Sequence, residues 1–291
     1  MLHQHSTSKS ELNLDSADHK EIDSFITSPF LYTVISAYNN QLVHFPLSIL
    51  ECKYLNVLNL SCNQLTHIPI EIAKLTQLKM LDLGHNKINH IIDEIGKLKE
   101  LQFLYLSDNN LEKLPDALSA LSNLLYLNAT DNNLKEIPKS YIALKSIKEL
   151  RLYNNKITNI SGSISHLINA REIYLMNNEI TEFPDDINHL EQVRILDLNN
   201  NKISSISSNI ANLKNMTTLN LRFNQLTQLP NEIGEISSIQ YIDLRANQLS
   251  TLPESMINLT QLTKLDLRWN NFTTEPTIIK KLRDNGCIVF I

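Results

Sequence analysis

The chain has 291 residues, room for one large domain or two ordinary ones, and 42% of them are hydrophobic and 20% charged, which excludes a disordered or fibrous protein. The formal net charge of −5 argues against a protein that binds nucleic acid or docks on an anionic membrane. Leu, Ile and Asn are in excess, at 48, 34 and 35 residues, whereas none of the 5 Gly lies in a phosphate-binding motif, which excludes Rossmann and P-loop enzymes.

Residues 1–31 differ from the rest of the chain and are predicted to form a flexible N-terminus followed by a helical cap. The first residues are polar, and Asp15 or Ser16 is a suitable N-cap for a short helix. Ile22 and Phe25 are three residues apart and would share one face of that helix. A cap of this kind would cover the first coil of a repeat stack.

The start of the chain lacks the hydrophobic core and the cleavage site of a signal peptide. No apolar run is long enough to cross a bilayer, and 3 Cys, an odd number, provide no disulfide framework. We therefore expect a cytoplasmic protein, which would leave the cell only by a route other than general secretion.

Residues 32–291 repeat one pattern every 23 residues, without insertion or deletion. Counting from Leu55 as position 1 of the second unit, positions 1, 4 and 6 are apolar and position 9 is asparagine. Alternation over positions 3 to 7 predicts a short strand whose positions 4 and 6 point inward and whose positions 3, 5 and 7 point outward. The register predicts eleven units and a final strand, in which Ile288 and Phe290 point inward and Val289 points outward.

Two further positions of the repeat explain the unusual composition. Eight of the 9 Pro stand at position 15, where the chain needs no sheet partner. The position-9 asparagines are expected to form an internal ladder, because a buried amide both donates to and accepts from the backbone of adjoining turns. This asparagine ladder consists of Asn40, Asn63, Asn86, Asn109, Asn132, Asn155, Asn178, Asn201, Asn224, Asn247 and Asn270.

The pattern LxxLxLxxNxLxx(I/L)PxxIxxLxx resembles the leucine-rich repeat family in its 23-residue intracellular form. Similar repeats occur in Ras-suppressor-like scaffold proteins and in many bacterial proteins. The resemblance implies an α/β repeat solenoid, a curved horseshoe with a parallel sheet on its concave face and short helical or 3₁₀ turns on its convex face. It also implies that residues 32–291 are a non-enzymatic module for protein–protein interaction.

The outward strand positions carry two clusters that we predict to bind a protein partner, because Tyr and Arg are frequent interface anchors. The central cluster consists of Phe103, Tyr105, Tyr126, Arg151, Tyr153, Tyr174 and Met176. The C-terminal cluster consists of Arg222, Phe223, Arg245, Arg268 and Trp269. The alternative for the aromatic side chains is packing between strands. The alternative for the arginines is neutralisation by Asp197, Asp243 and Asp266 at position 5, rather than capture of an acidic or phosphorylated segment.

His44, His67 and His90 all stand at position 13, which leaves open a ligand- or metal-binding protein that holds zinc on a histidine ladder. The alternative is an exposed loop position that is simply polar. His166 and His189 are expected to stack at position 20. No catalytic residue, resident metal or cofactor is predicted, because no Cys or carboxylate completes such a site.

The resemblance implies two kinds of partner. The usage of Asn, Ile and Lys is typical of bacterial proteins, and stand-alone repeats of this family in pathogens are often virulence effectors that bind host proteins. The alternative is a cytoplasmic scaffold, such as a small-GTPase partner of the Ras-suppressor type. In addition, the uncharged strand at residues 287–291 is a candidate edge for homodimerisation.

Overall fold

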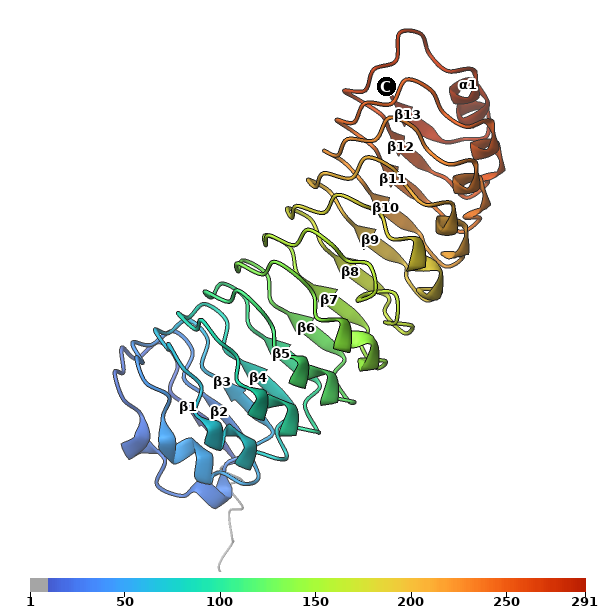
Figure 1. The fold of residues 1–291 in the computed structure, drawn as a ribbon. Helices are drawn as coiled ribbons and strands as arrows, with labels where there is room; N and C mark the ends of the chain where they lie inside the picture. Colours follow the sequence, from blue (N-terminus) through green and yellow to red (C-terminus); the bar gives the residue numbers. More distant parts are fainter. Residues whose placement is uncertain (1–9) are drawn as a thin grey trace, which may run out of the picture.

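The computed structural model describes residues 10–291, apart from the side chain of Ile142. These residues form an elongated, curved solenoid in which thirteen strands lie side by side, in chain order, in one parallel sheet (Figure 1). The strands are β1 (Glu11–Asn13), β2 (Val34–Ser36), β3 (Val57–Asn59), β4 (Met80–Asp82), β5 (Phe103–Tyr105), β6 (Tyr126–Asn128), β7 (Glu149–Arg151), β8 (Glu172–Tyr174), β9 (Ile195–Asp197), β10 (Thr218–Asn220), β11 (Tyr241–Asp243), β12 (Lys264–Asp266) and β13 (Ile288–Phe290).

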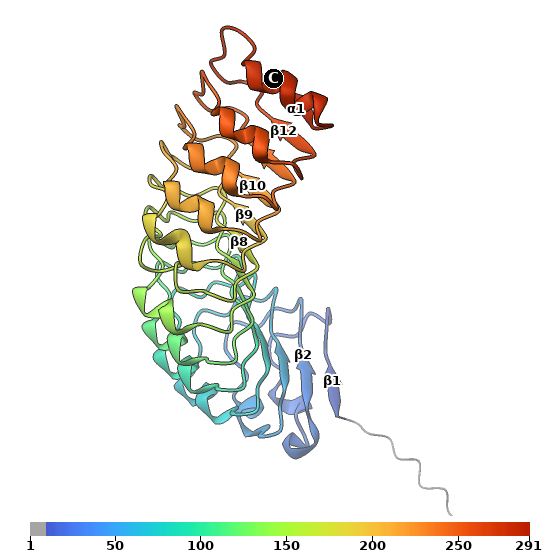
Figure 2. The same ribbon diagram turned by 90° about the vertical axis from the view of Figure 1, so that its right-hand side faces the viewer.

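Short 3₁₀ turns and one α-helix return the chain along the side opposite the sheet (Figure 2). Helical turns, about 10 Å across with their side chains, are wider than the strand spacing of about 4.8 Å, so the stack curves with the sheet inside. The helix is α1 (Thr277–Asp284). The 3₁₀ turns span Asp23–Phe25, Pro29–Leu31, Leu47–Glu51, Ile70–Lys74, Asp93–Lys97, Asp116–Ala120, Lys139–Ala143, Asp185–His189, Ser208–Asn212, Asn231–Glu235 and Glu254–Asn258.

The strands pair in the register that the repeat predicts from β2 to β12. Leu58 of β3 is opposite Leu81 of β4, so pairing joins equivalent positions of successive units. Leu58 and Leu60, at positions 4 and 6, are completely buried. Positions 3 and 5 of the strands are half-buried on the outward face in most units. The parallel sheet and the curved solenoid with 3₁₀ turns are therefore confirmed.

The asparagine ladder forms as predicted, and Asn132 shows its geometry. The Nδ2 of Asn132 donates to the carbonyl of Leu106 in the preceding unit (2.9 Å) and to those of Ala129 (3.2 Å) and Thr130 (2.9 Å) in its own unit. Its Oδ1 accepts from the backbone N–H of Leu111 (3.0 Å). Each amide thus satisfies backbone groups of two adjoining units, in place of the ladder partners that a bent coil lacks.

The N-terminal segment differs from the prediction of a helical cap. Residues 11–13 form β1, which pairs with β2 in the same 23-residue register, with Leu12 opposite Ile35. Asp15 does not cap a helix, because its Oδ1 accepts from Ser36 Oγ (2.6 Å) and from the N–H of Tyr38 (2.8 Å). The described part of this segment is a further coil of the solenoid, since Leu12 continues the inward pattern. Of the polar first residues, which were predicted to be flexible, residues 1–9 lie outside the described residues, whereas residues 11–13 form β1.

The register predicted for the last strand is wrong by one residue. Val289 is opposite Leu265 and is 9% exposed, so it points inward, whereas Ile288 and Phe290 are 60% and 41% exposed on the outward face. The last return is the eight-residue helix α1 followed by a turn at Gly286 with φ of +89°. The connection from β12 to β13 is one residue longer than the connections that contain a 3₁₀ turn. This extra residue exchanges the inward and outward positions of β13.

We expect Asn178→Ala to destabilise the protein by about 1–3 kcal/mol, the cost of leaving buried polar groups unpaired. The substitution removes the acceptor of the Ile157 N–H (3.0 Å) and the donor to the carbonyls of Leu152 and Leu175 (3.0 Å each). Urea unfolding followed by circular dichroism measures the change. Asn258→Ala, at an exposed asparagine, is the matched control and should change stability by less than about 0.5 kcal/mol. Equal effects of the two substitutions would contradict the role of the ladder.

Candidate binding surface on the concave face

The structure places the predicted central cluster on β5 to β8 and just beyond the ends of β7 and β8. Its members are half-buried, with one side of each against the sheet and the other in solvent. The rings of Tyr105 and Tyr126 contact each other with centroids 4.9 Å apart. The Arg151 guanidinium lies 5.7 Å from the Tyr126 centroid and 5.3 Å from that of Tyr174, so it joins the two rings.

The remaining three members of the central cluster extend it along the sheet. Phe103 is the cross-strand neighbour of Tyr126. Tyr153 and Met176 both stand at position 7, half-buried, directly after β7 and β8. The cluster is therefore one continuous row over four neighbouring strands.

Two glutamates belong to the same row, although they were not among the predicted site residues. Glu149 and Glu172 are opposite each other on β7 and β8. Glu149 pairs with the Nε of Arg151 (2.5 Å), and Glu172 accepts from the Tyr174 hydroxyl (2.7 Å). Both stand at position 3, which is the signal that would have identified them. Burial and then the hydrogen bond to Glu172 raise the pKa of Tyr174, which therefore remains a neutral donor at physiological pH.

In the C-terminal cluster, two of the three arginines are neutralised within the protein. Asp243 and Asp266 are each 1% exposed. Arg245 Nη2 lies 2.5 Å from Asp243, its Nε lies 3.5 Å from Asp266, and Arg268 Nη2 lies 2.7 Å from Asp266. For Arg245 and Arg268, the structure thus supports the internal lattice rather than a free anion site.

The charges of this lattice shift the pKa of its members in opposite directions. The hydrogen bond to Asp243 raises the pKa of Arg245, and the nearby charges of Asp243 and Asp266 add to this effect. Burial alone would raise the pKa of Asp266, but hydrogen bonds from Arg268 and the charge of Arg245 outweigh it and lower that pKa. Arg245 and Asp266 are therefore both ionised at neutral pH.

The third arginine of the cluster, Arg222, is held differently. Its guanidinium lies 4.3 Å from the centroid of Phe223 and 5.9 Å from that of Trp269. Within residues 10–291, Arg222 takes part in no ion pair, and its buried Nε has no hydrogen-bond partner. The sequence left open whether these arginines capture an anion or are neutralised internally. Arg245 and Arg268 are neutralised by aspartates, whereas among the described residues Arg222 is not.

Three residues outside the prediction complete the C-terminal cluster. Phe290, expected in the interior, instead faces outward and lies 5.3 Å from the Arg268 guanidinium. Lys264 lies 4.9 Å from the Tyr241 centroid and 5.8 Å from that of Phe290. The helical spacing of apolar residues in α1, followed by Gly286, is the sequence signal that would have corrected the register.

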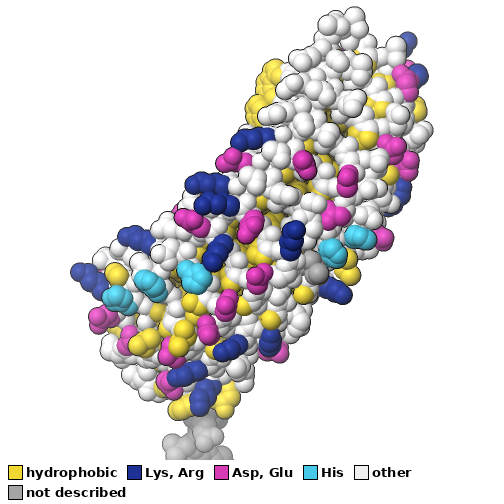
Figure 3. Space-filling model, viewed as in Figure 1, with side chains coloured by type: hydrophobic (Ala, Val, Ile, Leu, Met, Phe, Trp, Pro, Cys, Tyr) yellow, Lys and Arg dark blue, Asp and Glu magenta, His cyan; other side chains and the backbone are white. Residues whose placement is uncertain are grey.

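The histidines at position 13 do not form a metal site. His44, His67 and His90 are exposed, and the described part of the chain contains no group of three or more His, Cys, Asp or Glu able to hold a metal ion. His166 and His189 stack as expected, with centroids 5.8 Å apart. Figure 3 shows that charged side chains of both signs are interspersed on the face that it presents.

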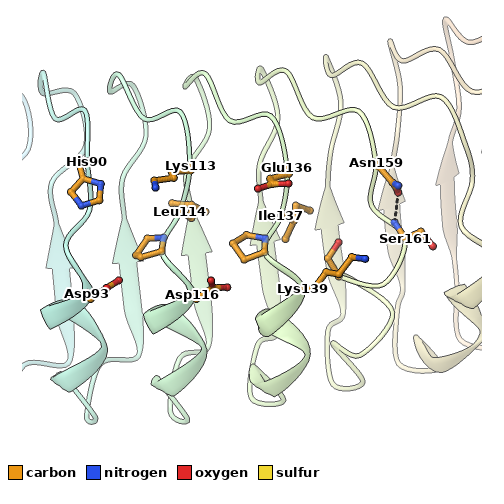
Figure 4. Close-up of a pocket in the computed structure, with 13 residues that line it drawn as sticks. His90, Asp93, Lys113, Leu114, Asp116, Glu136, Ile137, Lys139, Asn159 and Ser161 are labelled. Atoms are coloured by element: carbon orange, nitrogen blue, oxygen red, sulfur yellow. Dashed lines mark hydrogen bonds between the residues drawn. The ribbon is translucent and has the colours of Figure 1, made fainter.

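A groove of about 640 Å³ runs across the lateral surface of four neighbouring units (Figure 4). Charges of both signs line it, among them Asp93, Lys113, Glu136 and Lys139. The N–H of Ser161, which stands where most units have proline, donates to the side chain of a neighbouring asparagine (2.7 Å). This mixed lining contains no group of three or more His, Cys, Asp or Glu able to hold a metal ion. Nor is any helix among residues 10–291 long and apolar enough to span a bilayer.

Comparison with family models matches a leucine-rich repeat region at residues 32–175 and a leucine rich repeat at residues 168–226 and 214–272. No curated protein matches the chain. Among solved structures, a leucine-rich repeat protein of Leptospira interrogans is 25% identical, with 97% of this chain and 90% of that chain covered and a TM-score of 0.52.

Two further solved structures share the fold. An internalin of Listeria monocytogenes is 22% identical, with 89% of this chain and 86% of that chain covered and a TM-score of 0.56. A plant peptide hormone receptor, RGFR1, solved in complex with RGF2, is 27% identical, with 98% of this chain and 49% of that chain covered and a TM-score of 0.74. The chain therefore spans about half the length of the plant receptor chain.

We expect Asp266→Asn to weaken the pH dependence of stability in acid. Because the folded-state pKa of Asp266 is lowered, its carboxylate adds stability above about pH 4 that is lost as the pH falls through the folded-state pKa. The variant should have a lower Tm than the wild type at pH 7, and the difference should shrink toward pH 2. Thermal unfolding followed by circular dichroism measures both.

The exposed Asp185, on a 3₁₀ turn, provides the matched control for this substitution. Asp185→Asn should leave the wild-type pH profile unchanged. A constant Tm difference between wild type and Asp266→Asn from pH 7 to pH 2 would contradict the assigned ion pairs.

Proposed function

Because the chain belongs to the leucine-rich repeat family, whose repeats generally mediate protein–protein interaction, we propose that it is a non-enzymatic module that binds a protein partner on its concave face. The observation that carries this proposal is the continuous row of solvent-facing Tyr and Arg side chains on β5 to β8. A solvated sheet face does not require large aromatic side chains, and such residues on a rigid surface are typical interface anchors.

The contacts within the central cluster favour binding over packing alone. The rings of Tyr105, Tyr126 and Tyr174 are fixed by each other and by Arg151 before a partner arrives. A partner would therefore bind a preorganised surface and would not have to immobilise these side chains. Their hydroxyl groups add polar contacts that orient it.

The charges of the concave face indicate the polarity of the partner. The outward positions 3, 5 and 7 from β4 to β9 carry four acidic side chains and one basic one, Arg151. Those acidic side chains are Asp82, Glu149, Glu172 and Asp197. A partner whose surface is basic where it covers this region would complement it, and steering by such charges accelerates association.

We propose a host protein as the partner class, with this chain acting as a bacterial effector. Support comes from the residue usage and from the likeness to the Leptospira protein over nearly the full length of both chains. A cytoplasmic scaffold of the Ras-suppressor type is the alternative. Isolating binding partners from host lysate and from bacterial lysate distinguishes the effector from the scaffold. The same isolation with the variants described below shows whether the captured protein binds the concave face.

We also propose that a second copy pairs at β13. No strand of the described residues lies beyond β13, and Ile288, 60% exposed, faces outward from it. Light scattering of the full chain at several concentrations tests this proposal. A dimer that dissociates in an Ile288→Lys variant is expected, and a monomer at all concentrations would contradict it.

The double substitution Tyr153→Ala and Tyr174→Ala should weaken binding of the captured partner by tenfold or more, on the order of 1.4 kcal/mol or above. Titration calorimetry with the purified partner measures the affinity, and circular dichroism verifies the fold. Tyr54→Ala is the matched control, because Tyr54 is 51% exposed and lies outside the sheet. If only the Tyr54 variant lost affinity, the partner would bind elsewhere and the proposal would be wrong.

A further inference from the structure

Every unit turns out of its strand through a left-handed residue at position 8, and the C-terminal units fill this position unusually. From Asn39 to Asn200 the residue is Asn, Asp, His or Cys, with φ between +49° and +55°. The last three units instead have Phe223, Ala246 and Trp269, with φ of +51°, +51° and +64°. Asn and Asp tolerate the left-handed region, whereas bulky side chains are strained there.

The strained positions also interrupt a favourable interaction. In the middle of the solenoid the position-8 side chains form an exposed chain of hydrogen bonds, Asn200 to Asn177 (2.7 Å) and Asn177 to Asn154 (2.6 Å). The chain of hydrogen bonds stops where Phe223 replaces asparagine, and Phe223 and Trp269 are 42% and 62% exposed, so neither ring adds much to the core. Two strained, exposed aromatic residues at one end of the sheet are better explained by binding than by stability.

The two rings build a site together. Their centroids are 6.4 Å apart and their planes differ by 13°, with the small Ala246 in the unit between them. The Arg222 guanidinium lies against both rings. Its cationic end has no carboxylate partner within residues 10–291, although Arg245 and Arg268 beside it have theirs.

The local charge specifies the ligand. From β10 to β13 the outward positions 3, 5 and 7 carry four basic side chains against two acidic ones, Asp243 and Asp266, which leaves +2 on a chain of net charge −5. Lys264, like Arg222, forms no ion pair among the described residues. This excess of positive charge is small, and apolar rings surround it. Such a surface suits a ligand with a few carboxylates beside apolar side chains better than a polyanion.

We propose that Arg222, Phe223 and Trp269 bind an extended acidic segment of the partner protein. A partner carboxylate pairs with the Arg222 guanidinium, and a neighbouring apolar side chain packs on the exposed rings. This inference rests on the proposed function and gives the partner an orientation, with its acidic segment at the C-terminal end of the solenoid and its basic surface over β4 to β9.

The test uses the full chain and two fluorescein-labelled ten-residue peptides, one alternating Glu and Phe and the other alternating Lys and Phe. Fluorescence anisotropy measures binding to both. Because Trp269 is the one tryptophan of the chain, its intrinsic emission reports on contact with unlabelled peptide. We expect the Glu peptide to bind and to shift this emission. Failure of the Glu peptide to bind, or equal binding of the Lys peptide, would overturn the proposal.

Arg222→Gln should weaken binding of the Glu peptide about tenfold or more, since a hydrogen bond to a charged group is lost. Arg194→Gln is the matched control at an exposed arginine and should bind as the wild type does. An equal loss in both variants would show a general charge effect and would overturn the site. So would tighter binding of a single-stranded oligonucleotide or of phosphatidylserine vesicles than of the Glu peptide.

Phe223→Asn separates binding from structure. It removes the ring and the backbone strain, so we expect a Tm higher by a few degrees together with weaker binding of the Glu peptide. A lower Tm with unchanged binding would show that the ring is structural and would overturn the proposal. If the Glu peptide fails while the natural partner still requires Tyr153 and Tyr174, the acidic-segment inference alone is wrong and the proposed function stands.

Discussion

The hydrogen bonds of the asparagine ladder hold the whole solenoid together. Each unit bends sharply after three residues of strand, which leaves backbone groups without sheet partners in the interior. One amide per unit satisfies them across two units, as Asn132 does toward Leu106 and Leu111. Because the same bonds recur every 23 residues, they hold the strands in register and place the outward side chains in straight columns. The candidate binding surface is a consequence of that regularity.

The interior of the solenoid could be predicted from the sequence because burial has the same period as the repeat. Inward positions such as Leu58 and Leu60 had to be apolar, and the asparagines had to be internal. The ends could not be predicted in the same way, because there the repeat pattern changes. At the C-terminus, the connection through α1 from β12 to β13 is one residue longer than the connections through 3₁₀ turns. At the N-terminus, the strand at residues 11–13 lacks the asparagine that marks the other units.

The candidate surface was predictable in position but not in chemistry. Alternation placed Tyr126, Tyr174 and Arg245 on the outward face, and they are there. Which arginine is free depends on side-chain directions, and no repeat pattern encodes these. Arg245 turns back to a buried aspartate, whereas Arg222 turns toward two rings. The backbone strain at position 8 could not be predicted either. A left-handed conformation is indicated by the sequence only where the residue is Gly, Asn or Asp.

Hydroxyl-radical footprinting of the chain with and without its purified partner shows directly whether the partner binds the concave face. Mass spectrometry then reports how strongly each side chain is oxidised. We expect Tyr105, Tyr153 and Trp269 to become protected, while Tyr54 outside the sheet is oxidised equally in both states. Protection of Tyr54 and other residues outside the sheet, with the concave residues unchanged, would contradict this expectation.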